Sequence, residues 1–217
     1  MRESPLVVVL AVGYDETPER VEYKRVASTS IKKYYNHFGI PCEVMEKNHP
    51  DAAGTSPSMA RLLLFDLYPQ ADFILAQGLD MLPCNYRYNI QDFLCGDVVN
   101  MAVDCTRAGV YPRPCSFPNF KYNADLLGYP KSLAPFMRRV FTASLEDKLG
   151  YSNFEQYYLN DMLWNEQVYV NDLPTIFNKF YSNNFDYDRT AFCHYTNHMA
   201  NRDKYKYILQ FHPKEML

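Results

Sequence analysis

The sequence feature that most constrains the fold is an uninterrupted apolar run, Leu6 to Val12, near the start of the chain. Its β-branched residues and its lack of polar alternation are typical of a strand buried on both faces of a parallel sheet. Thr17 and Pro18 then form a favourable helix start, with Thr at the N-cap and Pro in the first turn. Apolar residues recur at helical spacing from Tyr23 to Phe38, and Ile40 to Met45 is predicted as a second strand. This β-α-β opening predicts a parallel pair of strands with a right-handed crossover.

The rest of the chain continues the alternation of helices and strands. A second helix is predicted from Ser56 to Leu67, and a third strand from Ala71 to Gln77. No internal repeat, low-complexity tract or linker divides residues 1–217, so the sequence predicts a single α/β domain. The other predicted elements are a strand from Asp97 to Val103, a Pro-rich loop from Thr106 to Pro118, helices from Leu133 to Leu149 and from Phe154 to Asn165, and a late strand from Arg189 to Tyr195.

The charge balance and the cysteines narrow the classes of function. Lys and Arg number 22 against 25 Asp and Glu, which gives a net charge of −3. This balance argues against a chain whose main partner is nucleic acid or an anionic membrane. The apolar run near the start is too short to span a bilayer and lacks the basic region and cleavage site of a signal peptide. Six scattered cysteines without C-x-x-C or zinc spacing are typical of reduced thiols, so we expect a cytoplasmic protein that is not secreted.

Ligands of open α/β sheets bind outside the carboxyl ends of the strands. Three common motifs for such sites, G-x-G-x-x-G, G-x-x-x-x-G-K-[ST] and G-x-S-x-G, are absent from the sequence. Asp80, directly after the third predicted strand, is the candidate that remains. Its carboxylate can hold a divalent cation against a diphosphate, and the alternative is an Asp that caps the turn at the strand end. The other segments expected at this edge are 12–15, 104–107 and the chain from His194 onward.

Short segments on both sides of Asp80 share their order with a known family. They are Ser56-Pro-Ser-Met-Ala-Arg-Leu-Leu-Leu-Phe-Asp-Leu-Tyr-Pro69, Ala71-Asp-Phe-Ile-Leu-Ala-Gln-Gly-Leu-Asp80, Tyr122-Asn-Ala124, Phe154-Glu-Gln-Tyr-Tyr-Leu-Asn160, Leu173-Pro174 with Asn178, and Phe192-Cys-His194. In this order they resemble the GT-A glycosyltransferases of family eight, with their Arg-Leu helix, Asp-x-Asp strand end, Asp-Gln-x-x-Leu-Asn helix and late His. The resemblance extends from the first predicted strand to His194 and so covers most of the chain.

The resemblance implies a GT-A fold, with a central, mostly parallel mixed sheet flanked by helices. It implies transfer of a sugar, with retention of configuration, from a UDP-sugar to a glycan or glycoprotein acceptor. It further implies a Mn²⁺ or Mg²⁺ ion held by Asp80 and His194. The resemblance implies that Val12, Gly13 and Tyr14 hold the base of the donor, and that Arg61 holds the diphosphate together with the metal, with Lys204 or Lys206 as further phosphate partners. It implies that Asn123, Glu155 and Gln156 line the donor sugar, and that Ala11, Gly78 and Leu79 also belong to the donor-binding residues. Glu155 or Gln156 is implied to face the reacting carbon as the catalytic residue.

Four positions depart from the family pattern. Gly78 stands where the first Asp of Asp-x-Asp is expected, so one ligand is missing and metal affinity is expected to be weaker. Asp125 replaces a Gly after Asn-Ala, and Glu155 replaces an Asp. The acidic residue expected after the first strand is displaced, and Tyr14 there packs either on the base or only on its neighbours.

A purely structural role stays open for several of these residues. Arg61 lies off the apolar side of its predicted helix and can be a solvated side chain, and His194 can be a satisfied core histidine. Gln156 can be a surface amide of its helix, and His198 and His212 are expected at the surface.

Two further classes of function also stay open. A sugar-nucleotide pyrophosphorylase has a similar fold layout, but the segment after the first strand, Gly13 to Glu16, is acidic where such an enzyme needs a Gly-rich basic loop. A non-catalytic nucleotide-sugar-binding domain is the other alternative, because Gly78 removes an expected metal ligand. The whole chain also resembles the amino-terminal domain of chlorella-virus glycosyltransferases that act on the major capsid protein, which implies further domains in a longer polypeptide and a place in the host cytoplasm.

Overall fold

The computed structural model describes residues 4–14, 17–103, 122–146, 155–181, 185–195, 208, 210 and 212–217. The predicted loop 106–118, the segment 104–107 expected at the ligand edge, Lys204, Lys206 and His198 lie outside these described residues. Within the described ranges, no helix is both long and apolar enough to span a bilayer. The four cysteines in this described part of the chain, Cys42, Cys84, Cys95 and Cys193, carry free thiols.

The described elements alternate between helices and strands. The α-helices are α1 (Pro18–His37), α2 (Leu64–Leu67), α3 (Ala134–Glu146) and α4 (Glu155–Asn165). The strands are β1 (Leu6–Leu10), β2 (Cys42–Met45), β3 (Phe73–Gly78), β4 (Met81–Pro83), β5 (Val99–Val103), β6 (Tyr122–Pro130), β7 (Val170–Leu173), β8 (Lys179–Phe180) and β9 (Phe192–His194). Short 3₁₀ helices cover Pro50–Ala52, Pro57–Leu63, Ile90–Phe93, Lys131–Leu133, Thr175–Phe177 and Lys214–Met216.

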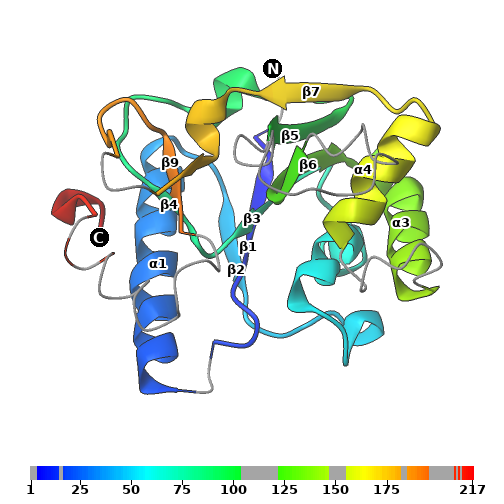
Figure 1. Ribbon diagram of the computed structural model, residues 1–217, viewed down its shortest axis with the longest axis horizontal. Coiled ribbons are helices and arrows are strands. Elements are labelled where there is room, and N and C mark those ends of the chain that lie inside the picture. The colour runs from blue at the N-terminus through cyan, green and yellow to red at the C-terminus, as the bar shows by residue number, and fades with distance from the viewer. Residues whose placement is uncertain are drawn as a thin grey trace, which may run out of the picture.

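A six-stranded sheet in the order β2-β1-β3-β6-β5-β7 forms the centre of the molecule (Figure 1). β1 pairs in parallel with β2 and β3, and β5 pairs in parallel with β7. β6 runs antiparallel to both of its neighbours, β3 and β5. The predicted β-α-β opening and the mostly parallel sheet are therefore confirmed. The carboxyl ends of β1 and β3 meet at one edge, where Leu10 pairs with Gly78.

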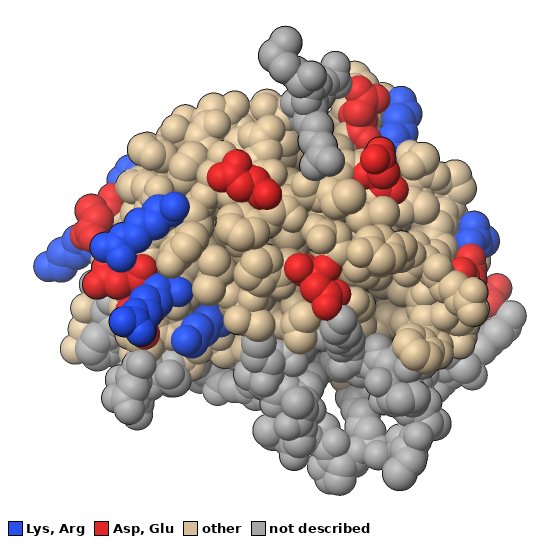
Figure 2. Space-filling view, turned by 90° about the horizontal axis from the view of Figure 1, so that it is seen from above, with Lys and Arg blue, Asp and Glu red and all other residues tan. Residues whose placement is uncertain are grey.

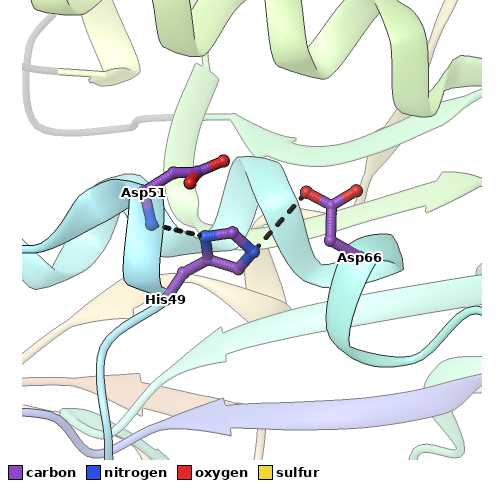
Figure 3. Close-up of side chains that lie close together, drawn as sticks. All are labelled: His49, Asp51 and Asp66. Atoms are coloured by element: carbon purple, nitrogen blue, oxygen red, sulfur yellow. Dashed lines mark hydrogen bonds and ion pairs between the residues drawn. The ribbon is translucent and has the colours of Figure 1, made fainter.

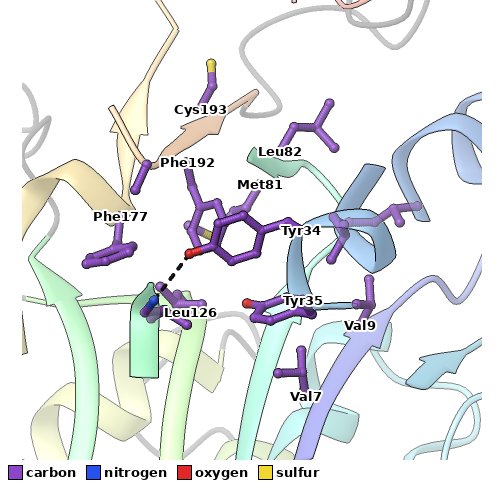
Figure 4. Packing of buried hydrophobic residues seen from close by; sticks show 14 of the residues in the cluster. Val7, Val9, Tyr34, Tyr35, Met81, Leu82, Leu126, Phe177, Phe192 and Cys193 are labelled. Carbon is purple, nitrogen blue, oxygen red and sulfur yellow. Dashed lines mark hydrogen bonds between the residues drawn. The ribbon is translucent and has the colours of Figure 1, made fainter. Parts of the chain in front are cut away.

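Helices cover both faces of this sheet because β1 is apolar on both sides. Val7 and Val9 pack in the core on the side of α1, whereas Val8 and Leu10 pack with α2, α3 and α4. Figure 1 shows α1 on one side of the sheet and α3 with α4 on the other. Figure 4 shows Tyr35 of α1 close to Val7 and Val9 in the first of these cores. Burial on both faces is the environment that the apolar run predicts.

A second, smaller sheet in the order β4-β9-β8 continues from the end of β3. β4 starts directly after Asp80 and pairs antiparallel with β9, so that Met81 lies opposite His194. The backbone N–H of Tyr195 donates to the carbonyl of Asp80 at 2.8 Å. β8 pairs in parallel with β9 and places Phe180 opposite His194. This pairing brings the late strand to the carboxyl end of β3.

β6 carries a bulge where it leaves β5. Met101 of β5 pairs with Leu127, but the next residue, Ala102, pairs with Asn123. Residues 124–126 therefore lie between two consecutive pairs of the β5–β6 ladder. A bulge bends its strand and redirects the side chains that it carries. Here the bulged residues lie beside the carboxyl end of β3.

The side chain of Asn160 on α4 holds the start of β6. Its Oδ1 accepts from the backbone N–H of Tyr122 at 2.9 Å, and its Nδ2 donates to the carbonyl of Tyr122 at 3.0 Å. One amide thus replaces both hydrogen bonds that a neighbouring strand would make with this residue. The helix predicted from Phe154 to Asn165 is in this way the element that anchors the bulged strand.

The segment predicted as a second helix is mostly a 3₁₀ helix, Pro57–Leu63, and only α2 continues it as an α-helix. The Tyr129 hydroxyl donates to the carbonyl of Arg61 at 2.7 Å, an acceptor that a regular α-helix uses internally. The residues from Met59 to Leu64 are all buried, so every side of this segment, including the side that carries Arg61, faces protein. The prediction that Arg61 lies off the apolar side is therefore wrong.

We expect Asn160→Ala to lower the free energy of unfolding by about 1–3 kcal/mol, because it removes two hydrogen bonds between the buried Asn160 side chain and the backbone of Tyr122. Asn165→Ala, in the last turn of the same helix, removes only an exposed hydrogen bond to Asp161 and is expected to change stability by less than about 0.5 kcal/mol. Urea unfolding of the two variants measures the difference. Equal losses would contradict the anchoring role of Asn160.

Candidate functional site

Three side chains with metal-binding atoms meet at the carboxyl end of β3. Asp80 directly follows β3, Asp125 lies in the bulge of β6, and His194 ends β9. One ligand atom of each lies within 4.8 Å of the other two. The sequence predicts Asp80 and His194 as partners, and the structure places them together. Asp125 enters the sequence analysis only as a departure from the family pattern.

The imidazole ring of His194 is held in one orientation by its neighbours. Its Nδ1 lies 2.8 Å from Oδ1 of Asn178, whose Nδ2 donates to the Val103 carbonyl at 3.4 Å. Because an amide oxygen only accepts, Nδ1 carries a proton and donates it to Asn178. Nε2 then faces the carboxylates, 3.2 Å from Oδ2 of Asp125 and 3.7 Å from Oδ1 of Asp80. A hydrogen bond on the far nitrogen is the usual way to orient a metal-binding histidine.

The charged groups of this cluster shift one another's pKa values. Burial lowers the pKa of His194, but Asp80 and Asp125 outweigh burial and raise that pKa to about 10. Burial raises the pKa of Asp125, but Arg61 and His194 outweigh it and hold that pKa well below the ordinary range. Burial and the two carboxylates raise the pKa of the Tyr14 hydroxyl, which stays neutral. At neutral pH the site therefore presents an ionised Asp125 carboxylate and a proton on Nε2 of His194 that a cation can displace.

The donor set fits a divalent cation. Carboxylate oxygens are the ligands that Mg²⁺ and Mn²⁺ prefer, and a nitrogen donor adds affinity for Mn²⁺ over Mg²⁺. Because Nδ1 of His194 is bound to Asn178, Nε2 is the nitrogen that can coordinate an ion. Asp80, Asp125 and His194 are thus a chemically coherent set of ligands from two strands and one strand-end turn.

Arg61 is buried, with a side chain only 3% exposed, and it binds the protein itself. Its Nε donates to the Ser58 carbonyl at 2.9 Å, its Nη1 to the Ala124 carbonyl, and its Nη2 to Oδ1 of Asp125 at 2.9 Å. Oε1 of Glu155 lies 3.6 Å from Nε, and Oε2 of Glu155 accepts from the Ser58 hydroxyl at 2.6 Å. The alternative of a solvated Arg61 is therefore wrong, because residues 59–63 are all buried and Arg61 is enclosed with them. Its contact with a diphosphate stays a prediction.

Gln156, in the first turn of α4, and Asn123, in β6, lie on either side of the bulge. Oε1 of Gln156 accepts from the backbone N–H of Ala124 at 2.9 Å, and Oδ1 of Asn123 accepts from that of Asp125 at 2.8 Å. Both side chains are about 95% buried. Among the described residues, none accepts a hydrogen bond from Nε2 of Gln156 or Nδ2 of Asn123. Gln156 is therefore not the surface amide that the sequence left open, and its NH₂ group remains a donor.

The segment after β1 lies at the same edge of the sheet. Ala11 is buried, Val12 and Tyr14 are partly buried, and Gly13 is exposed. Gly13 has φ 81°, a left-handed conformation that favours glycine. The Tyr14 ring packs on Tyr23 with centroids 5.5 Å apart, and the Tyr23 hydroxyl donates at 2.9 Å to the carbonyl of Leu79, the residue before Asp80. The predicted base-binding segment is thus a neighbour of the carboxylate cluster.

Gly78 and Leu79 occupy positions with little free space. The Leu79 side chain lies in the apolar core, and its carbonyl accepts from the Tyr23 hydroxyl at 2.9 Å. A Cβ atom at Gly78 would lie 3.0 Å from Oδ1 of Asp80 and 3.3 Å from Cβ of Asp125. The carboxylate of Asp125 thus lies where a side chain at position 78 would project.

A second acidic group, shown in Figure 3, consists of His49, Asp51 and Asp66. Nδ1 of His49 accepts from the backbone N–H of Asp51 at 3.1 Å, and its Nε2 lies 3.5 Å from Oδ2 of Asp66. Arg138 of α3 binds Oδ2 of Asp51 at 3.1 Å and also Oδ2 of Asp66. Because Arg138 neutralises both carboxylates and Nδ1 is already occupied, we interpret this group as a structural contact between α3 and the 3₁₀ segment.

His212 is buried, which contradicts its predicted place at the surface. Its Nε2 donates to the Pro83 carbonyl at 2.8 Å, and its Nδ1 lies 3.2 Å from the Tyr195 hydroxyl. Burial lowers the pKa of His212 to about 4, so the imidazole is neutral. The side chain anchors the last described residues to β4 and takes no part in the carboxylate cluster.

The charged side chains on the face drawn in Figure 2 are unevenly distributed. On that face, Lys and Arg side chains gather at the margins, while Asp and Glu side chains are scattered among uncharged residues. The described part of this face shows no continuous basic tract of the kind that follows a nucleic-acid backbone.

Asp125 and Asn178 are the two site residues that sequence reasoning did not place. Asn178 belongs to the segments that resemble the family but has no role assigned from the sequence, and the structure shows that it orients His194. The signal for Asp125 is its relation to Gly78: the sequence has Gly where an Asp is expected, and Asp where a Gly is expected.

Comparison with known proteins gives its result at the level of the fold. The sequence matches no family model, and no curated protein sequence is similar to it. The structure is similar to that of a glycosyltransferase involved in the glycosylation of the major capsid of PBCV-1, with a TM-score of 0.69 and 12% identity over 95% of this chain and 99% of that chain. It is also similar to the apo-form glycosyltransferase GlyE of Streptococcus pneumoniae TIGR4, with a TM-score of 0.57 and 13% identity over 95% of this chain and 60% of that chain. A second GlyE structure matches with a TM-score of 0.51 and 14% identity over 81% of this chain and 46% of that chain.

At these identities the likeness shows the fold alone. The chain has a glycosyltransferase fold, and the predicted α/β arrangement with a central sheet flanked by helices is confirmed. Membership in family eight stays a prediction.

We expect Arg61→Met to lower the free energy of unfolding by about 3–5 kcal/mol, because it removes the buried cation that pairs with both Asp125 and Glu155. Arg87→Met is the matched control, because its ion pair with Asp188 joins side chains that are 64% and 82% exposed. Exposed pairs contribute at most about 1 kcal/mol. Urea unfolding measures both values, and similar losses in the two variants would show that Arg61 is not the buried partner described above.

Proposed function

We propose that this chain is a glycosyltransferase that moves a sugar from a UDP-linked donor to a glycan or glycoprotein acceptor, assisted by Mn²⁺ or Mg²⁺. The observation that carries the proposal is the cluster of Asp80, Asp125 and His194 at the carboxyl end of β3, within a glycosyltransferase fold. Ligands of α/β sheets bind at that edge. Two carboxylates and an imidazole are a suitable set for an ion that also binds a diphosphate.

In this proposal each residue of the cluster has a separate task. Asp80, Asp125 and His194 hold the cation through oxygen and Nε2 atoms, while Asn178 keeps Nε2 directed at the carboxylates. When bound, a divalent cation neutralises the negative charge that develops on a leaving diphosphate. Arg61 fixes one oxygen of Asp125 and thereby positions a ligand of the ion.

The segment after β1 suits the uracil and ribose of the donor. Backbone approach is easiest at Gly13, which has no side chain and a left-handed conformation. Tyr14 offers a flat apolar ring beside the cluster, and its neutral hydroxyl is a hydrogen-bond donor. Ala11 and Val12 lead from β1 into this segment, so the same strand end positions both the base and the diphosphate.

The donor sugar is proposed to lie against Asn123 and Gln156. Their amide oxygens are fixed by backbone N–H groups of the bulge, which leaves the NH₂ groups to bind sugar hydroxyls. Gln156 is the residue we propose to face the reacting carbon, in a reaction that retains configuration. Glu155 has both oxygens engaged by Ser58 and Arg61, so we assign it to positioning Arg61.

Two observations weigh against the alternatives. A non-catalytic domain was suggested by the missing carboxylate at Gly78, but Asp125 brings a carboxylate to the same space. A pyrophosphorylase needs a basic loop after the first strand, and the described part of that loop presents Gly13 and Tyr14.

Our proposals for the acceptor and for further domains rest on the structural neighbours. One structural neighbour is involved in the glycosylation of a viral major capsid, which supports a glycoprotein or glycan as the acceptor. The chain spans 60% of the GlyE structure, which supports further domains in related polypeptides. We propose a cytoplasmic location, in the host cytoplasm if the protein is viral.

We expect UDP to raise the melting temperature more with Mn²⁺ than with a chelator present. A ligand that binds only the native state, at a concentration about 100-fold above its Kd, stabilises it by about 2.7 kcal/mol. A bound cation would be held by Asp80, Asp125 and His194 and would supply positive charge for the diphosphate, so its removal should abolish most of that gain. Thermal unfolding with UDP, other nucleoside diphosphates and UDP-sugars, each with Mn²⁺, Mg²⁺ or chelator, provides the measurement.

Two outcomes of this experiment would contradict the proposal. Equal shifts with and without metal would exclude a cation that bridges protein and diphosphate. No shift with any nucleoside diphosphate, in a folded protein that binds Mn²⁺, would exclude a nucleotide-sugar donor.

We expect Gln156→Glu to lower the rate of UDP-sugar hydrolysis or transfer by on the order of a hundredfold, the effect of losing one well-placed donor. The Glu oxygen can still accept from the Ala124 N–H, so the fold is retained, but the side chain no longer donates to the sugar. Because the lost contact lies at the sugar, the affinity for UDP alone should change little.

Gln70→Glu, on the exposed turn before β3, adds the same charge outside the site and serves as the control. Turnover, UDP affinity and melting temperature are measured on both variants. Full turnover of a folded Gln156→Glu protein would remove Gln156 from the reaction.

A further inference from the structure

Positions 78 and 125 oppose each other across the pair formed by β3 and β6. Gln77 pairs with Leu126 in this antiparallel ladder, so Gly78 and Asp125 are the next opposed positions. Side chains at opposed positions project to the same face of a sheet, with Cβ atoms about 4.5–5.5 Å apart. A Cβ atom at Gly78 would in fact lie 3.3 Å from both Cβ and Oδ1 of Asp125. There is therefore room for one further carboxylate beside Asp80. It can be attached to β3 at position 78 or to β6 at position 125.

We propose that Asp125 is the cation ligand that a carboxylate at position 78 would otherwise supply, and that its place on β6 lets it neutralise Arg61 as well. The inference rests on the proposed function, since it concerns the ion of that site. It assigns to Asp125 two separate tasks, one for each carboxylate oxygen, and it explains why position 78 is a glycine.

The two oxygens of Asp125 face different partners. Oδ2 lies 3.2 Å from Nε2 of His194, on the side of the candidate ligands. Oδ1 accepts from Nη2 of Arg61 at 2.9 Å. An ion held at Oδ2 therefore leaves the contact with Arg61 in place. The ligand is fixed before the ion arrives, which reduces the ordering needed on binding.

Arg61 has few other ways to balance its charge. Its side chain is 3% exposed, and among the described residues the other carboxylate near it is Glu155, at 3.6 Å. Glu155 also accepts from Ser58, so it is shared. A buried cation that loses a partner is destabilising. Moving the carboxylate from 125 to 78 should therefore preserve the metal site but weaken the fold.

This separation of metal affinity from stability gives the test. We measure Mn²⁺ binding from the electron paramagnetic resonance signal of the free ion, and stability from urea unfolding, in the full chain without nucleotide. The variants are Asp125→Gly, the exchange Gly78→Asp/Asp125→Gly, the isosteric Asp125→Asn and, as an exposed carboxylate outside the site, Asp97→Asn.

We expect Asp125→Gly and Asp125→Asn to weaken Mn²⁺ binding by about tenfold to a hundredfold, the scale of disturbing a metal ligand or its support. The exchange variant should recover most of the lost affinity while remaining as unstable as Asp125→Gly, because Arg61 still lacks its partner. Asp97→Asn should match the wild type in both measurements.

The outcomes separate this inference from the proposed function. A wild-type chain that binds no Mn²⁺ contradicts both. Wild-type binding that Asp125→Asn leaves unchanged overturns only the role of Asp125. A folded exchange variant that binds Mn²⁺ no better than Asp125→Gly overturns the equivalence of the two positions. If the exchange variant does not fold, Asp125→Asn decides, because its amide oxygen can still accept from Arg61.

Discussion

The buried guanidinium of Arg61 is the interaction on which the candidate site depends. It binds its own 3₁₀ helix through the Ser58 carbonyl, the bulge of β6 through Ala124 and Asp125, and the start of α4 through Glu155. A buried charge is tolerated only when it is paired and its donors are satisfied, so these contacts are a requirement of the fold. Three segments that are far apart in the sequence are therefore held together beside the end of β3.

Strand pairing supplies the other half of the site. β4 begins where β3 ends, and its antiparallel ladder with β9 sets Met81 opposite His194. The hydrogen bond from Tyr195 to the carbonyl of Asp80 extends this ladder past the strand end. Asn178 then fixes the orientation of the His194 ring. The ion pairs of Arg61 thus position Asp125, and the backbone hydrogen bonds between β4 and β9 position Asp80 and His194. Together they bring two carboxylates and an imidazole to one point, where a cation can bind.

How much of this was predictable differs from residue to residue. The apolar run at β1 predicts that this strand is covered on both faces of the sheet, because otherwise every second apolar side chain would be exposed to water. Asp80 and His194 are predicted from the order of short segments, and their meeting is seen in the structure. Arg61 and His212 are buried, although the sequence predicts both at the surface. Both predictions consider only the neighbouring residues in the sequence and not the distant segments that pack on these side chains. In the sequence, Asp125 is an Asp where the family pattern has Gly, just as Gly78 is a Gly where that pattern has Asp. That the two positions lie opposite each other follows only from the register between β3 and β6.

The sequence by itself determined the alternation of strands and helices, the direction of the first strands and the side chains at their carboxyl ends. These follow from local rules, since periodicity, capping residues and β-branched composition act over a few neighbouring residues. Only the tertiary structure decided which carboxylates share a site, that packing on all sides of residues 59–63 encloses Arg61, and that α4 anchors the bulge of β6 through Asn160 and Gln156. The physical reason is that each of these depends on a contact between segments distant in sequence, and such contacts are set by packing and by the need to satisfy buried charges and backbone groups.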